Sequence, residues 1–182
     1  MMPILFALYS IIITSLIWAR FGFFKVSSIK SRRVALIYDC LVAIQIIVTF
    51  AKFYTAEPIK SLIAIIAGCS YLSCLWFFWF AILKVRQLDF AFGVQINRLL
   101  IDGPYKFVRH PFYSCYIAIW LTSTLLFNSA YLWITLVSLT AFYYIAAKSE
   151  EDAIYRSSYS EHYRRYSANV GMLLPRIYKW KS

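Results

Sequence analysis

The chain has 182 residues, of which 62% are hydrophobic and 15% carry a charge. A water-soluble domain contains about 45–50% apolar and about 25% charged residues, so the composition excludes a soluble globular protein and predicts an integral membrane protein. The net charge of +11 comes from basic residues that lie between the apolar runs. This is the positive-inside pattern of membrane loops, and we therefore expect membrane lipid, not nucleic acid, to meet these charges.

Five apolar segments follow one another along the chain, at 3–24, 34–56, 61–83, 112–127 and 130–147. About 20 helical residues cross the hydrocarbon core, so the first three predict membrane-spanning helices. The first has no charged start and no small-x-small cleavage site, and we expect it to be a retained span, not a signal peptide. The last two are shorter, and we predict a tight helical hairpin that turns at residues 128–129.

The basic residues gather in three segments, at 25–33, 84–111 and 148–182. The turns at 57–60 and 128–129 carry few charges. The positive-inside rule then places the three basic segments in the cytosol, the amino terminus outside and the carboxyl terminus inside. The predicted fold is an all-α, multi-pass membrane protein with about five transmembrane helices and a functional face toward the cytosol.

Within this single domain, we expect two parts. Residues 1–83 form three transmembrane helices, and residues 84–182 form the functional region. Asp39 is the one acid of the second apolar segment. It either lines a polar cavity or is a near-surface acid paired with Arg20 or Arg33.

Cysteine and histidine spacing gives no sign of a metal site. The two histidines lie far apart in sequence, and no C-x-x-C pair occurs. The four cysteines all fall inside apolar runs, where they act as small polarizable packing residues: Cys40, Cys69, Cys74 and Cys115. We therefore predict that the chain binds no metal.

Residues 148–169 have a helical pattern, with acids first and Arg164 and Arg165 late, which suits a helix dipole. Four tyrosines spaced four, four and three residues apart share one face of this helix: Tyr155, Tyr159, Tyr163 and Tyr166. Two interpretations stay open on physical grounds. The helix lies on the membrane as an amphipathic element, or its tyrosine face folds back over residues 97–113 and covers a pocket.

A polar, cationic segment lies between the two apolar halves of the chain. It spans Gly103–Tyr113 and reads GPYKFVRHPFY. Gly103-Pro104 is a turn signal, and Pro111 suits the first turn of the following helix. The amino terminus of such a helix favours an anionic group nearby. Arg109 and His110 precede it directly and are strong hydrogen-bonding groups.

Two sequence blocks resemble the isoprenylcysteine carboxyl methyltransferase family. Residues 97–113, NRLLIDGPYKFVRHPFY, follow a signature that runs roughly H-x-L-V-x-x-G-x-Y-x-x-x-R-H-P-x-Y. The second block resembles the carboxy-terminal signature of that family at Glu151-Asp152, Tyr159-Ser160, Tyr163, Tyr166, Val170 and Pro175. The resemblance covers residues 97–175 and extends to the related phospholipid methyltransferases.

The resemblance implies methyl transfer from S-adenosyl-L-methionine to the carboxylate of a lipid-modified cysteine. It implies a cofactor pocket at the cytosolic interface, formed by residues 84–111 and the C-terminal region, and a lipophilic acceptor that enters from the bilayer. Arg109 and Glu151 match catalytic positions. The matched cofactor contacts are Asn97, Arg98, Leu99, Leu100, Tyr105, His110, Pro111, Phe112, Tyr113 and Glu151.

The sequence departs from the family pattern at several positions. Asn97 stands where the family has histidine, and Ala147 stands where larger members have the arginine that binds the substrate carboxylate. The family has a small residue after the tyrosine of R-H-P-x-Y, and here Ser114 and Cys115 stand in its place. Lys148 or Arg109 could replace the missing arginine.

Three other interpretations remain. A phospholipid amine is an alternative acceptor, and it would need a site for a head-group amine. A reductase of the same broad superfamily would use a nicotinamide cofactor, yet no separate phosphate-binding glycine loop is seen. A non-catalytic membrane protein would have no polar cavity near His110 and Glu151.

Overall fold

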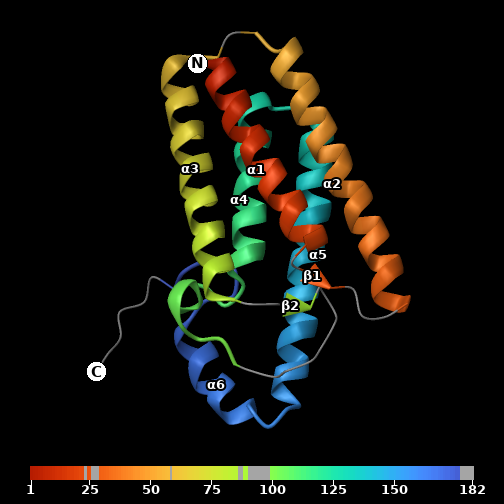
Figure 1. The fold of residues 1–182 in the computed structure, drawn as a ribbon, viewed down its shortest axis with the longest axis vertical. Helices are drawn as coiled ribbons and strands as arrows, with labels where there is room; N and C mark the ends of the chain where they lie inside the picture. The colour runs from red at the N-terminus through yellow and green to blue at the C-terminus, as the bar shows by residue number, and fades with distance from the viewer. Residues whose placement is uncertain (23, 26–28, 58, 86–87, 90–98, 177–182) are drawn as a thin grey trace.

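The computed structural model is a bundle of long helices with a shorter helix at one end (Figure 1). The structure describes residues 1–22, 24–25, 29–57, 59–85, 88–89 and 99–176. The helices are α1 Met2–Gly22, α2 Ile29–Thr55, α3 Ser61–Lys84, α4 Pro111–Phe127, α5 Ala130–Tyr155 and α6 Ser160–Asn169. A 3-10 turn, η1, covers Gly103–Lys106, and the two-residue strands β1 Phe24–Lys25 and β2 Leu88–Asp89 pair in parallel.

Length and composition make α1, α2, α3 and α5 candidate membrane spans among the described residues. The fifth apolar helix, α4, has 17 residues. At 1.5 Å per residue it is about 26 Å long, close to the roughly 30 Å hydrocarbon core, and it packs between α3 and α5. The prediction of an all-α, multi-pass membrane protein with about five transmembrane helices is confirmed in its fold class.

Helix α2 begins at Ile29, five residues before the predicted span and inside the segment expected to be a loop. The difference has a simple cause. Hydropathy marks where a helix enters the hydrocarbon, whereas the helical hydrogen bonds start earlier, in residues that stay polar.

The hairpin between α4 and α5 is as tight as predicted. Asn128 adopts a left-handed conformation, with φ of 43°, and its N–H donates to the carbonyl of Thr124 at 2.8 Å. Asparagine tolerates this region better than most residues. Its side-chain oxygen accepts a hydrogen bond from the indole N–H of Trp133 at 2.9 Å, which fixes the start of α5.

The outside of the bundle is apolar, as expected in lipid. Large apolar side chains such as Ile4, Leu72 and Trp76 are exposed on the outside. Small and polar residues occupy contacts between helices, where Ser70 bonds Thr122 at 2.7 Å and Tyr71 bonds Ser123 at 2.8 Å. Such contacts allow the helices to pack closely. They stabilise helix association in lipid, where the hydrophobic effect does not drive helices together.

The two ends of the bundle are different. The amino terminus and the turn between α4 and α5 lie at one end, and α6 lies at the opposite end (Figure 1). Which side faces the cytosol stays a prediction.

Asp39 forms an ion pair inside the bundle. The guanidinium of Arg20 donates to it through Nε at 3.0 Å and through Nη2 at 2.8 Å. The pair joins α1 to α2, so of the two alternatives for Asp39 the paired acid is the one observed, with Arg20 as its partner.

The prediction of a single helix over residues 148–169 is wrong. Helix α5 continues to Tyr155 and α6 starts only at Ser160. Between them, the Ser157 hydroxyl accepts a hydrogen bond from the Tyr159 N–H at 3.2 Å. Serine side chains compete for backbone groups in this way, and the competition ends the helix. Tyr159 lies in the break, so the four tyrosines do not share one helix.

Candidate active site

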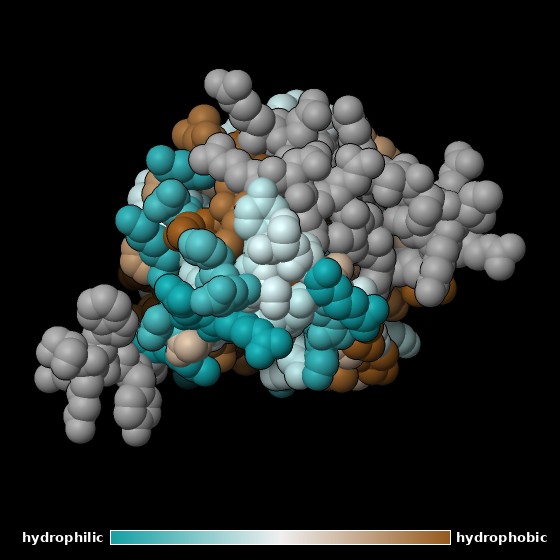
Figure 2. Space-filling view, turned by 90° about the horizontal axis from the view of Figure 1, so that it is seen from below, coloured by the Kyte–Doolittle hydropathy of each residue, from teal (hydrophilic) through white to brown (hydrophobic). Residues whose placement is uncertain are grey.

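The two sequence blocks meet at the polar end of the bundle, where hydrophilic residues gather on the end face (Figure 2). Val108 and Gly171 form a parallel bridge. The N–H of Arg109 donates to the carbonyl of Gly171 at 2.9 Å, and the N–H of His110 donates to that of Met172 at 3.1 Å. Segments about 60 residues apart in sequence are therefore joined by backbone hydrogen bonds.

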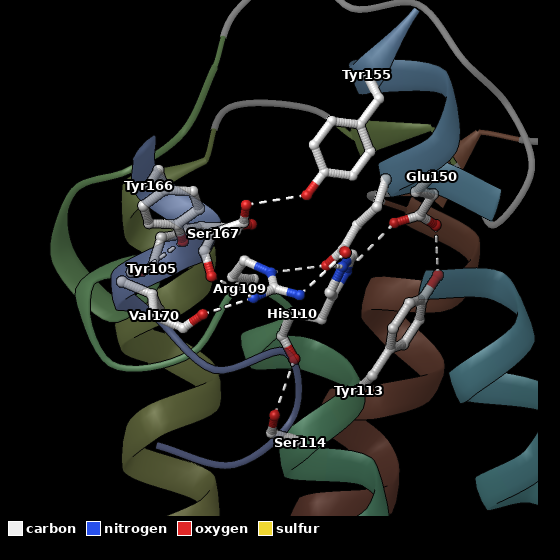
Figure 3. Close-up of polar contacts among 11 residues, drawn as sticks. Tyr105, Arg109, His110, Tyr113, Ser114, Glu150, Tyr155, Tyr166, Ser167 and Val170 are labelled. Carbon is white, nitrogen blue, oxygen red and sulfur yellow. Dashed lines mark hydrogen bonds and ion pairs between the residues drawn. The ribbon is translucent and has the colours of Figure 1, made fainter. Parts of the chain in front are cut away.

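Arg109 is the centre of this junction (Figure 3). Its Nε and Nη2 donate to the two carboxylate oxygens of Glu151, at 2.7 and 3.0 Å. Its Nη1 donates to the backbone carbonyls of Ser167, at 3.1 Å, and Val170, at 2.6 Å. Only arginine has a planar fork that can bind a carboxylate and two carbonyls at once. Through these hydrogen bonds, the Arg109 side chain connects the segment before α4 to the end of α5 and to the end of α6.

His110 lies between two carboxylates at the start of α4. Its Nε2 is 3.1 Å from Glu151 Oε1, and its Nδ1 is 3.5 Å from Glu150 Oε2. Burial disfavours the imidazolium, but the hydrogen bonds and charges of Glu150 and Glu151 outweigh it, so the pKa of His110 is raised. A protonated ring has a donor on each nitrogen and suits both partners.

Tyr113 holds the second carboxylate. Its hydroxyl donates to Glu150 Oε1 at 2.6 Å. Its ring is stacked on that of His110, with centroids 5.6 Å apart, and on that of Tyr143, at 5.4 Å. Aromatic stacking on both sides limits the movement of the hydroxyl.

The tyrosines of the carboxy-terminal region fold over the 97–113 segment. Tyr166 donates its hydroxyl to the backbone carbonyl of Tyr105 at 2.6 Å, and Tyr155 shares a 2.9 Å hydrogen bond with Ser167. Tyr163 is 3% exposed and packs between Tyr155 and Tyr166. Tyr166 therefore folds back onto the segment that contains Tyr105, as one of the two interpretations predicted, whereas the pocket that this interpretation includes stays a prediction.

The predicted site residues divide into four groups. Five lie together in or beside the cluster: Tyr105, Arg109, His110, Tyr113 and Glu151. Pro111 begins α4, and Phe112 instead faces the core, with its ring centroid 5.8 Å from that of Phe78. Leu99 and Leu100 are half-buried ahead of η1. Asn97 and Arg98 lie outside the described residues.

No role was predicted for Glu150 or for the carbonyls of Ser167 and Val170. An acidic run at 150–152 was visible, but it could not show which acid meets Arg109. The expected pocket between residues 84–111 and the C-terminal region involves residues 90–98, which the structure does not describe, so the pocket stays a prediction.

The arrangement is suited to holding and positioning a ligand. Arg109 and His110, whose pKa is raised, face two carboxylates, Glu150 and Glu151. Buried charges of this kind persist only when they are paired and hydrogen-bonded, as they are here. The cluster lies at the base of the apolar bundle, where a polar ligand and a lipid could meet.

The comparisons with known proteins agree with this geometry. The model of the phospholipid methyltransferase family matches residues 63–162, which run from α3 into α6. The searches of curated proteins and of solved structures found no match. The family match covers more than half of the chain and includes Arg109, His110 and both glutamates of the cluster. The chain therefore belongs to the phospholipid methyltransferase family, whose superfamily of integral membrane methyltransferases also contains the isoprenylcysteine methyltransferases.

Proposed function

We propose that the protein transfers a methyl group from S-adenosyl-L-methionine to a lipophilic acceptor held in the bilayer. One observation supports this most strongly. The Arg109–Glu151–His110 cluster joins the two signature blocks at the boundary of the apolar bundle, inside the region that the family model matches. A cofactor from water and an acceptor from lipid can both reach such a boundary.

The residues proposed to hold the cofactor fit its chemistry. The acids offer acceptors for amino and hydroxyl groups, and Tyr105, His110 and Tyr113 lie in or beside the same cluster. Asn97, Arg98, Leu99, Leu100, Pro111 and Phe112 complete the proposed set on the strength of the family resemblance. When bound, S-adenosylmethionine supplies a methyl group already activated by its sulfonium sulfur.

The protein then has to align the acceptor with that methyl group and exclude water. Positioning of this kind can lower a barrier by about 7–11 kcal/mol without any covalent help from the chain. In this proposal Arg109 and Glu151, which match catalytic positions, act by keeping the two segments in place. The folded-back tyrosines exclude water from the same end.

We favour a phospholipid amine as the acceptor. Ala147, at the position of the carboxylate-binding arginine, is fully buried. Arg109 already makes four hydrogen bonds within the protein. Neither position leaves a free cation for a carboxylate, whereas the family match points to phospholipids. An isoprenylcysteine carboxylate stays the second candidate because of the R-H-P-F-Y block, and the exposed Lys148 of α5 is a cation available for it among the described residues.

A radiolabelled methyl-transfer assay tests the proposal. Purified protein in detergent is incubated with methyl-labelled cofactor and either phosphatidylethanolamine or a farnesylcysteine acceptor. We expect label in the lipid product from phosphatidylethanolamine. Label only in the farnesylcysteine ester would reverse the order of the acceptors, and label in neither lipid, nor in a total lipid extract, would refute the methyltransferase proposal.

A further inference from the structure

The outer surface of α3 carries an open groove of about 540 Å³, in the carboxyl-terminal half of the helix. Four residues of α3 line it: Leu72, Ser73, Trp76 and Phe77. The ring of Trp76 is stacked on that of Phe80, with centroids 5.5 Å apart, which holds one wall in place. The Ser73 hydroxyl already donates to the carbonyl of Cys69, at 2.8 Å. The groove therefore offers an apolar surface that suits a hydrocarbon chain.

The groove leads along α3 to Leu83 and Lys84, which are both exposed. Leu83 follows Leu72 by eleven residues, and Lys84 follows Ser73 by eleven, which is close to three full turns of an α-helix. The groove and these two residues thus share one face. At 1.5 Å per residue, the groove lies about 10–18 Å from Lys84, whereas one leaflet of the hydrocarbon core is about 15 Å deep. A lipid with its acyl chain in the groove would place its head group at Lys84.

The side chain of Lys84 packs on the backbone of η1, beside the end of α3 (Figure 1). Gly103 has a φ of 64°, and a Cβ atom there would come within 2.9 Å of the Lys84 Cγ and 3.3 Å of its Cδ and Cε. Glycine permits this backbone conformation and also leaves room for the lysine stem. The Lys84 ammonium group is therefore kept at the junction of α3 and η1.

A second lysine lies on the same side of η1. Lys106 follows Gly103 by three residues, and in a 3-10 turn such residues lie one above the other. Its Nζ is 3.8 Å from a carboxylate oxygen of Asp102, and both side chains are exposed. An exposed pair of this kind is weak, so it does not prevent Lys106 from meeting a phosphate. Two ammonium groups and one carboxylate leave a net positive charge at the end of the groove.

We propose that α3 and η1 form a binding site for an anionic phospholipid. Its acyl chain lies in the groove at Leu72 and Trp76, and its phosphate lies between Lys84 and Lys106. Basic residues close to the end of a membrane span attract anionic head groups in this way. The lipid is held and not methylated, so the proposal does not depend on methyl transfer. Its position would connect α3 to the segment that leads into Arg109.

Titration of the purified full-length protein with lipid, followed by native mass spectrometry, tests the site. The two probes are phosphatidylglycerol, which is anionic, and phosphatidylcholine with the same acyl chains, which has no net charge. Lys84→Gln removes the charge at the head group, and its control is Lys60→Gln, an exposed lysine at the opposite end of α3. Ser73→Phe fills the groove. Its control is Thr14→Phe on α1, because the exposed Thr14 hydroxyl also bonds a carbonyl one turn earlier, that of Ser10 at 2.9 Å.

The wild type should bind phosphatidylglycerol more tightly than phosphatidylcholine. Lys84→Gln should raise the Kd of phosphatidylglycerol about fivefold and leave that of phosphatidylcholine unchanged, since only the anionic head group gains from the charge. Ser73→Phe should raise both dissociation constants about threefold or more, because the ring takes the place of the chain. Trp76→Ala removes one wall of the groove and should act in the same direction as Ser73→Phe. Lys60→Gln and Thr14→Phe should bind like the wild type.

Three results would overturn the proposal. Equal affinity of the wild type for the two lipids would show that no anionic head group is selected. Lys84→Gln that binds phosphatidylglycerol like Lys60→Gln would remove the head-group contact. If Ser73→Phe binds like Thr14→Phe, or fails to fold while Trp76→Ala binds like the wild type, the groove holds no chain. Methyl-transfer activity plays no part in these measurements, so their failure leaves the proposed function standing.

Discussion

At the scale of single residues, the chain uses one arginine to hold three pieces of backbone together. Arg109 and its carboxylate partner are both nearly buried, with side chains 10% and 7% exposed. An unpaired charge at this depth would be costly, so each partner depends on the other. The sequence predicted that Arg109 and Glu151 belong to the site. It could not distinguish Glu150 from Glu151, because adjacent helical residues point about 100° apart and the register relative to Arg109 appears only in the fold.

We expect Arg109→Lys to lower the free energy of unfolding by about 2 kcal/mol or more, since lysine keeps the charge but loses the fork and the bonds to Ser167 and Val170. Arg165→Lys is the matched control, because Arg165 forms an exposed pair with Glu161. Its effect should be near zero. Thermal unfolding in detergent measures both variants, and equal midpoints would contradict the account of Arg109.

The pKa of His110 predicts a dependence of stability on pH. A group whose pKa is raised by folding stabilises the folded state fully below its unfolded value, about 6.5, and loses this contribution as pH rises through its folded value. The unfolding midpoint of the wild type should therefore fall relative to that of His110→Gln from about pH 6.5 upward. Parallel curves for the two proteins over this range would show that His110 is not held as an imidazolium.

At the scale of elements, hydropathy located the helices well because a membrane span must be apolar along its length. The bounds of α1 and α3 differ from the predicted segments by at most two residues at each end. The break between α5 and α6 escaped prediction because it depends on the Ser157 hydroxyl, which leaves periodicity unchanged. The approach of residues 108–110 to residues 171–172 is likewise a tertiary contact with no local sequence pattern.

Gly171 provides the test at this scale. A Cβ atom there would come within 1.9 Å of the Leu174 carbonyl oxygen, so Gly171→Ala must displace the backbone that pairs with Val108 and Arg109. We expect a loss of stability of about 1–3 kcal/mol and weaker cofactor binding. Gly68→Ala is the control, because its Cβ would meet Leu5 at an ordinary 3.6 Å. A Gly171→Ala protein that binds and unfolds like Gly68→Ala would show that this backbone junction does not support the site.

At the scale of the whole molecule, an apolar bundle carries its polar chemistry at one end. Glu57 and Arg164 are exposed near opposite ends of the bundle and report which end faces the cytosol. The positive-inside rule predicts that a membrane-impermeant thiol reagent, added to intact cells, labels Glu57→Cys and not Arg164→Cys. In inverted vesicles the pattern should reverse, and labelling of Arg164→Cys from outside would refute the predicted orientation.

The central claim is that the two sequence blocks, joined through Arg109, His110 and Glu151, form one binding site for S-adenosylmethionine. Titration calorimetry of the purified full-length protein in detergent tests it most directly. The account predicts saturable binding by the wild type and by Glu161→Gln, and a dissociation constant at least about tenfold higher for Glu151→Gln, whose partners Arg109 and His110 lose their common carboxylate. No binding by the wild type at millimolar cofactor, or equal binding by Glu151→Gln, would contradict it.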